Sequence, residues 1–158
     1  MREQFGPKVK IILTGISMGA ATVMMAAGEE LPPNVIGVLA DCGYASPKAI
    51  LKKVIRQMRI PVGTGYFLVR LGAKLFGGFD PEEDSAVEAM KKCKVPVIFF
   101  HGEEDALVPC EMSRECFEAC TVKKRLVTMP GAEHGLCYPV DAERYLQELW
   151  EFFADEAV

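Results

Sequence analysis

Short apolar segments alternate with helical segments along most of this 158-residue chain. The apolar segments are six or seven residues long and rich in β-branched side chains, as strands buried on both faces are. The expected strands are Val9–Thr14, Val35–Ala40, Val95–His101 and Lys124–Met129, and the expected helices are Ser17–Glu30, Glu111–Cys120 and Asp141–Phe153. This order predicts an α/β fold with a parallel sheet of about four strands and helices on both faces.

One long segment, residues 44–92, interrupts the alternation between the second and third strands. It contains several expected helices, with breaks at Pro61-Val62-Gly63 and Gly77-Gly78. Two interpretations stay open: the helices pack on the sheet as core, or they form a cap whose apolar residues line a substrate pocket. Since the length suits one domain, we expect residues 1–158 to be a single domain with a helical insert.

Composition and charge exclude several classes of protein. A net charge of −4 provides no basic surface for nucleic acid. The uncharged run Ile11–Gly28 has the length of a membrane span, but polar residues and glycines interrupt it, so we expect a turn and no span. The amino terminus has no apolar signal segment, which favours a cytoplasmic protein with reduced thiols. The six cysteines contain no Cys-x-x-Cys pair, and we therefore predict no disulfide frame, no metal and no cofactor.

A G-x-S-x-G motif, Gly15-Ile16-Ser17-Met18-Gly19, stands between the first strand and the first helix. In this context the motif is typical of a nucleophile elbow, a sharp turn that holds the serine in strained backbone angles. Side chains at Gly15 and Gly19 are expected to collide with neighbouring backbone. We therefore expect Ser17 to be a nucleophile. The alternative is an ordinary glycine-rich turn with a capping serine.

A nucleophilic serine needs a general base, and the chain has two histidines. His101 ends an apolar strand, which indicates a structural role, whereas His134 lies in a polar loop after the last strand and is the expected base. Four carboxylates at the ends of the two middle strands compete for the orienting acid: Asp41, Glu103, Glu104 and Asp105. All four follow the chain order serine, acid, histidine, so that order does not choose between them.

The elbow, the HGEEDALVP segment and the PGAEHG loop together resemble the carboxyl-terminal half of α/β-hydrolase-fold enzymes. In that family the acid loop commonly reads His-Gly-x-x-Asp-x-x-Val-Pro, which matches His101, Gly102, Asp105, Val108 and Pro109. This resemblance selects Asp105 over Glu103 and Glu104. Asp41 stays as the alternative, because some family members carry the acid after the preceding strand.

The resemblance implies a Ser17–His134–Asp105 triad that works through an acyl-enzyme, with the backbone N–H of Met18 donating to the oxyanion. It also implies a truncated fold, because the family's sheet has eight strands and the nucleophile follows the fifth. Four strands, two helices and the loop with the second oxyanion N–H are then absent. Val9–Thr14 becomes an exposed apolar edge, and we expect a homodimer or higher homo-oligomer to cover it.

The leading function is that of a serine carboxylesterase that hydrolyses small-molecule esters with short to medium acyl groups. A peptidase or thioesterase uses the same triad and is the alternative within enzymes. A non-catalytic half-domain that acts as an interaction module is the alternative of a different class. Hydrolysis of p-nitrophenyl esters, with Ser17→Ala as control, distinguishes these possibilities.

Overall fold

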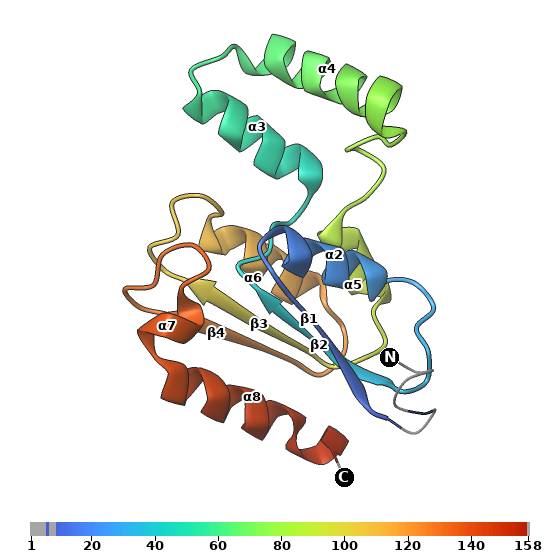
Figure 1. The fold of residues 1–158 in the computed structure, drawn as a ribbon, viewed down its shortest axis with the longest axis vertical. Coiled ribbons are helices and arrows are strands. Elements are labelled where there is room, and N and C mark those ends of the chain that lie inside the picture. The colour runs from blue at the N-terminus through green and yellow to red at the C-terminus, as the bar shows by residue number, and fades with distance from the viewer. Residues whose placement is uncertain (1–5, 7–8, 158) are drawn as a thin grey trace.

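The computed structural model describes residues 6 and 9–157 and contains one four-stranded parallel sheet in the order β1-β2-β3-β4 (Figure 1). The strands are β1 (Ile11–Ile16), β2 (Val35–Asp41), β3 (Val97–Gly102) and β4 (Lys124–Met129). The predicted fold class, a parallel sheet with helices around it, is confirmed. Most of the amino-terminal segment in which we expected no secretory signal lies outside the described residues.

Helices connect the strands and extend beyond the last one. They are α2 (Met18–Ala26), α3 (Pro47–Gln57), α4 (Val62–Gly72), the π-helix η1 (Ala73–Gly77), α5 (Ala86–Lys92), α6 (Cys110–Ala119), α7 (Cys137–Val140) and α8 (Ala142–Ala157). None of the helices in the described part of the chain is long and apolar enough to cross a membrane.

The two faces of the sheet carry separate apolar clusters, because successive strand residues point to opposite sides. On one face, residues of α2, α5 and α6 pack against the strand residues Val38, Ala40, Val97 and Phe99. On the other face, residues of α8 pack against Leu39, Ile98, Phe100 and Val127. A Cβ at Gly37 would lie 2.2 Å from the ring of Phe153, so α8 rests directly on β2 there.

Strand β1 is an edge strand that pairs with β2 alone among the described strands. Its residues alternate between half-buried and exposed, with Ile12 36% and Ile16 56% exposed. The edge expected at Val9–Thr14 is therefore present, shifted two residues along the chain. The backbone N–H and C=O groups on the outer side of β1 face no other described strand, and the side chains on one of its faces are exposed.

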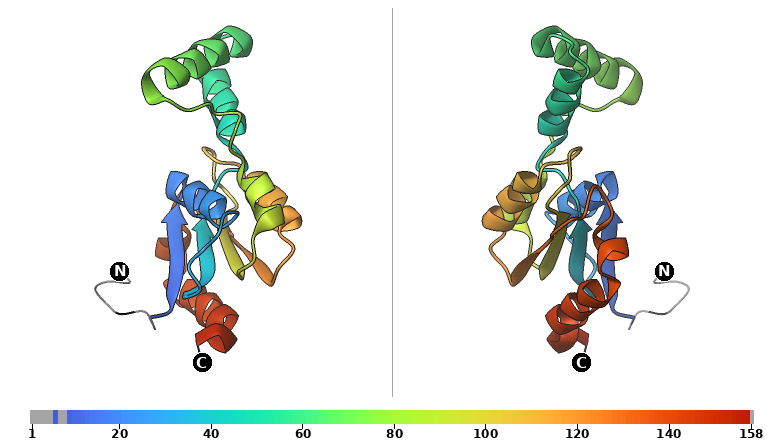
Figure 2. Two further views of the ribbon diagram at one scale, coloured as in Figure 1. Left: turned by 90° about the vertical axis from the view of Figure 1, so that its right-hand side faces the viewer. Right: turned by 90° about the vertical axis from the view of Figure 1, so that its left-hand side faces the viewer.

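Residues 44–92 divide into two parts. Helices α3 and α4 stand away from the sheet, beyond the carboxyl ends of the strands (Figures 1 and 2). Helix α5 instead packs against α2 and α6 in the layer that covers the sheet. Of this segment, α5 therefore packs in the core, whereas α3 and α4 lie apart from the sheet (Figure 1), and we refer to α3, α4 and η1 as the cap helices.

Candidate active site

Ser17 occupies a strained turn between β1 and α2. Its backbone angles are φ 56° and ψ −115°, a region that residues with a Cβ rarely adopt, and its N–H donates to the carbonyl of Asp41 at 2.8 Å. A Cβ at Gly15 would lie 2.2 Å from the carbonyl carbon and oxygen of Gly19. The elbow therefore requires glycine at position 15, as predicted.

The same expectation for Gly19 is wrong. A Cβ at Gly19 would meet nothing within 4 Å. Gly15 approaches the backbone carbonyl of Gly19, and the side-chain position of Gly19 points into open space. Met18 is the first residue of α2, so its backbone N–H has no acceptor within the helix and is directed to the amino-terminal end. This is the end at which a helix favours negative charge.

His134 connects Ser17 to Asp105 by two hydrogen bonds. Nε2 of His134 lies 2.9 Å from Oγ of Ser17, and Nδ1 lies 2.7 Å from Oδ2 of Asp105. The three residues follow β1, β3 and β4, so the parallel strands bring them to the same end of the sheet, where the strands have their carboxyl termini. With Nδ1 protonated and donating to the carboxylate, Nε2 is free to accept the serine proton.

Asp105 is fixed by its own loop. Its Oδ1 accepts the backbone N–H of Leu107 at 2.9 Å and that of Val108 at 2.8 Å, and its side chain is fully buried. The competing acids bind elsewhere: Asp41 accepts the Tyr145 hydroxyl at 3.1 Å, and Glu103 accepts the Thr128 hydroxyl at 2.7 Å. Of the acids considered, the structure brings Asp105 to His134.

His101 is fully buried and has a partner at each ring nitrogen. Nδ1 lies 2.6 Å from Oγ of Ser113, and Nε2 lies 2.8 Å from the carbonyl oxygen of Val108, to which it donates. The predicted structural role is confirmed. The ring also reaches Asp105, with Nε2 3.3 Å from Oδ2, a contact that we had not predicted from the sequence.

A buried group of Asp41, Cys42, Cys137 and Tyr145 adjoins the triad. The sulfurs of Cys42 and Cys137 are 3.7 Å apart, and Cys42 Sγ accepts the backbone N–H of Gly135 at 3.4 Å. The hydrogen bond to Cys42 and burial raise the pKa of the Cys137 thiol, and burial raises the pKa of Tyr145. All six cysteines are free thiols. Sequence reasoning missed this group, because its members stand up to 104 residues apart.

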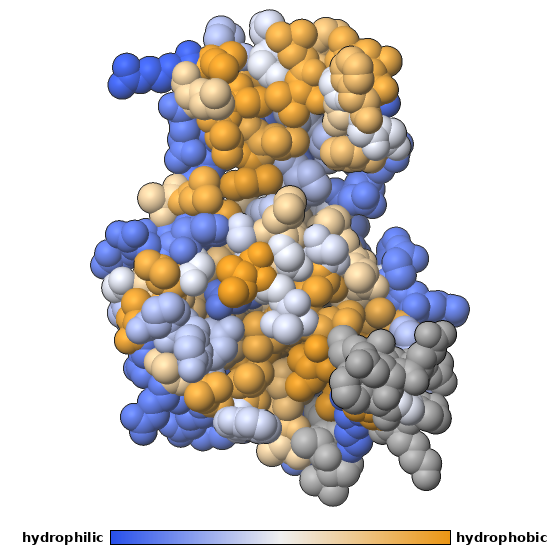
Figure 3. Space-filling view, in the orientation of Figure 1, coloured by the Kyte–Doolittle hydropathy of each residue, from blue (hydrophilic) through white to orange (hydrophobic). Residues whose placement is uncertain are grey.

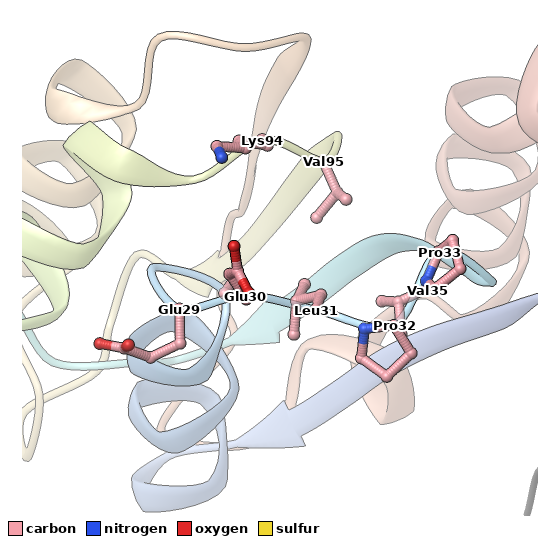
Figure 4. Close-up of a pocket in the computed structure, with 9 residues that line it drawn as sticks. Glu29, Glu30, Leu31, Pro32, Pro33, Val35, Lys94 and Val95 are labelled. Carbon is pink, nitrogen blue, oxygen red and sulfur yellow. The ribbon is translucent and has the colours of Figure 1, made fainter.

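Two other surfaces bear on where a substrate could bind. A hollow lined by Leu31, Pro32, Val35, Val95 and neighbouring residues lies at the amino ends of the strands, opposite the triad, and does not serve it (Figure 4). Apolar side chains gather over the cap helices α4 and η1, which stand at the triad's end of the sheet (Figure 3). The exposed ones are Phe67, Leu68, Val69, Leu71, Leu75 and Phe76.

Known proteins resemble this chain in both sequence and fold. The family model described as "Serine aminopeptidase, S33" matches residues 56–140, which include Asp105 and His134. An uncharacterised Bacillus subtilis protein, YqkD, is 26% identical over 139 residues, or 87% of this chain and 46% of its own length. A bifunctional esterase/perhydrolase of Acinetobacter calcoaceticus is 32% identical over 98 residues, or 49% of this chain and 36% of its own length. The chain thus spans about half the length of the relatives it matches, or less.

Solved structures share the fold. An esterase of Pyrococcus furiosus superimposes with a TM-score of 0.67 and 20% identity, over 98% of this chain and 56% of its own. A puromycin-hydrolysing peptidase of Mycobacterium tuberculosis superimposes with a TM-score of 0.70 and 19% identity, over 96% of this chain and 23% of its own. The family model matches more than half of the chain, which shows that the chain belongs to the serine aminopeptidase S33 family of the α/β-hydrolase superfamily.

Proposed function

We propose that this hydrolase-family chain is a serine carboxylesterase that acts on esters with short to medium acyl groups. The observation that carries the proposal is the continuous hydrogen-bonded chain from Ser17 through His134 to Asp105. In this arrangement a weak nucleophile meets a base whose orientation is already fixed. The esterase relatives and the esterase fold neighbours support ester cleavage as the reaction class.

The proposed reaction is acyl transfer in two steps. Nε2 of His134 takes the proton of Ser17 as Oγ attacks the ester carbonyl, and Asp105 stabilises the imidazolium. The Met18 N–H donates to the oxyanion, a type of contact worth about 3 kcal/mol in the transition state of other hydrolases. The alcohol leaves with the proton from His134. Water then attacks the acyl-enzyme, His134 accepts its proton, and the carboxylic acid departs as Ser17 is regenerated.

The cap helices supply the surface that we assign to the acyl group. Phe67, Leu71 and Leu75 lie on α4 and η1 and are between 41% and 69% exposed, which leaves their apolar area free for a bound chain. Burial of that area against an acyl chain stabilises the complex by roughly 25 cal/mol per Å². This is the physical basis for preferring esters whose acyl part is apolar.

The first test is a series of p-nitrophenyl esters from acetate to long acyl chains. We expect hydrolysis by the wild-type chain, with rates that decline for the longest acyl groups. Ser17→Ala is expected to reduce the rate by at least about 10³-fold, because the nucleophile is lost. Ser85→Ala, at the amino-terminal cap of α5, serves as the matched control and is expected to retain the rate. Hydrolysis that survives Ser17→Ala would contradict the mechanism.

An aminopeptidase is the second candidate, because the matched family model is described as a serine aminopeptidase and a fold neighbour is a peptidase. Aminoacyl p-nitroanilides test it with the same Ser17→Ala control. Faster cleavage of these amides than of the esters would replace the esterase proposal. Absence of cleavage of esters, thioesters and amides alike would favour a non-catalytic interaction module.

A further inference from the structure

The group of Asp41, Cys42 and Cys137 contains chemistry that the triad does not use. Asp41 ends β2, Cys42 follows it, and Cys137 begins α7 on the far side of the His134 loop. The three residues are at most 1% exposed. A carboxylate oxygen and the two sulfurs lie within 4.8 Å of one another.

The separation of the sulfurs suits a tetrahedral metal ion. Two thiolates bound to zinc at about 2.3 Å with tetrahedral angles stand about 3.8 Å apart. The sulfurs of Cys42 and Cys137 are 3.7 Å apart before any ion is bound. The two sulfurs therefore already have the separation that two ligands of one tetrahedral ion require.

The carboxylate of Asp41 offers a third ligand oxygen. Its Oδ2 accepts the Tyr145 hydroxyl, whereas its Oδ1 is buried and has no hydrogen-bond partner among the described residues. A buried acceptor of this kind destabilises the folded chain unless something binds it. The Tyr145 contact also fixes the orientation of the carboxylate, as outer contacts commonly do at metal centres.

Backbone strain marks the same place. Cys42 has φ 52°, one of three non-glycine residues with positive φ in the described part of the chain, and Ser17 is another. Residues held in such conformations cluster at functional sites. The two strained residues are neighbours in space, because the Ser17 N–H donates to the carbonyl of Asp41, the residue directly before Cys42.

From this geometry we propose that Asp41, Cys42 and Cys137 form a binding site for a thiophilic divalent cation, with Zn²⁺ as the ion that the ligand set fits. Binding replaces the two thiol protons, which are released to solvent, and gives a centre with two thiolates, one carboxylate and a net charge of −1. A fourth position stays open to water. Because the site is closed from solvent, uptake requires the segment around α7 to open and is slow.

The site is coupled to the triad through Cys42. Its sulfur accepts the N–H of Gly135, the residue next to His134, and lies within 4.8 Å of ligand atoms of both Asp105 and His134. Binding replaces the thiol proton of Cys42 and leaves a thiolate, which accepts the Gly135 N–H more strongly than the thiol does and so displaces the loop that carries His134. Zinc is therefore expected to inhibit the hydrolase, which makes the site a means of control over the neighbouring reaction.

Cobalt binding to the reduced, metal-free protein tests the site without reference to activity. We expect Co²⁺ to produce the near-ultraviolet thiolate-to-metal absorption and the intense visible bands of a tetrahedral centre, at one ion per chain, and we expect Zn²⁺ to abolish both. Cys137→Ser is expected to remove the thiolate bands of this site. Asp41→Asn is expected to weaken binding at least about tenfold while the thiolate bands persist.

Cys110→Ser is the matched control, since Cys110 is a buried cysteine at the start of α6. It is expected to bind cobalt as the wild type does. Circular dichroism confirms that each variant is folded. No thiolate band in the wild type, or an equal loss in Cys110→Ser and Cys137→Ser, would overturn the proposal. Because these readouts are spectroscopic, they stand even if ester hydrolysis is not found.

Discussion

Gly15 and Gly19 frame the elbow, yet the structure gives them different roles. A methyl group at position 15 would overlap the Gly19 carbonyl at 2.2 Å, whereas one at position 19 would meet nothing within 4 Å. We expect Gly15→Ala to displace Ser17 and abolish ester hydrolysis. Gly19→Ala is expected to retain hydrolysis and to stabilise α2 by up to about 1 kcal/mol, because alanine favours the helix. Thermal unfolding and p-nitrophenyl acetate hydrolysis measure both effects.

The acid of the triad can be identified by comparing carboxylates. Asp105→Asn removes the acceptor that fixes the tautomer of His134, and we expect kcat to fall on the order of 10⁴-fold, as the same change does in serine proteases. Glu103→Gln, whose side chain contacts Thr128 instead, is the control and should change kcat little. An equal loss in both variants would refute the assignment of Asp105.

The three residues of the proposed triad could be named from the sequence because local patterns mark them. Gly15 beside Ser17 reflects a steric requirement of one turn, and the loop around Asp105 has a spacing that a family resemblance identifies. Cys42 and Cys137 have no such local mark. Their sulfurs meet because β2 and α7 meet in space, 95 residues apart along the chain. The lack of a Cys-x-x-Cys pair therefore gave no information about this site.

The strands were predicted more closely than the ends of the helices. Residues 124–129 form β4 with the bounds expected from the sequence, and Pro130-Gly131 ends the strand. Helix α2 ends at Ala26, four residues before the expected end at Glu30. A Cβ at Gly28 would lie 2.7 Å from the Cα of Ala89 in α5, so the end of α2 reflects packing against a helix distant in sequence. Helix α7 is a single turn and too short to show a periodic pattern.

The position of the cap could not be inferred, because an apolar helix face indicates burial without naming the partner. In the structure Phe76 is 92% exposed, and ion pairs attach the cap to the rest of the chain. Arg70 of α4 binds Asp80 through Nε at 2.8 Å and Nη2 at 2.7 Å, and Lys74 of η1 binds the same carboxylate at 2.7 Å. These contacts join the cap to the loop that leads to α5.

This cluster predicts a pH dependence of stability. Hydrogen bonds from Arg70 and Lys74 hold the pKa of Asp80 well below its usual value of 3.8, so the unfolded chain binds a proton more readily than the folded one. The ion pairs of Asp80 therefore make their full contribution to the free energy of unfolding above about pH 4. That contribution is lost as the pH falls toward the pKa of Asp80 in the folded chain. Asp80→Asn should unfold at a lower temperature than the wild type at neutral pH.

The difference between wild type and Asp80→Asn should shrink on acidification below about pH 4, because Asp80 of the unfolded wild-type chain is protonated there while the carboxylate of the folded chain keeps its charge to lower pH. Thermal unfolding followed by circular dichroism at neutral and acid pH measures it. Glu83→Gln in the same loop is the control, since Glu83 belongs to none of the ion pairs described around Arg70. A difference that stays constant across this pH range would contradict the assignment to the Asp80 charge.

At the scale of the whole molecule, the sheet has one end that carries the proposed triad and one side edge that is open. Ser17, Asp105 and His134 all follow the carboxyl ends of strands, and the cap stands over the same end (Figure 1). The open side is β1, which pairs with β2 alone among the described strands and exposes Ile12 and Ile16. A flat apolar edge with unpaired backbone groups is a template for pairing with another strand.

We therefore expect the 158-residue chain to self-associate through β1, with a second copy covering the edge. Sedimentation velocity at micromolar concentration should show a dimer or higher oligomer. Ile12→Lys places a charge on the exposed face of the edge and is expected to shift the equilibrium to monomer. Ile60→Lys is the matched control, since Ile60 is similarly exposed, at 41% against 36%, but lies in the turn between α3 and α4. A single monomeric wild-type species, or equal dissociation in both variants, would exclude association through this edge.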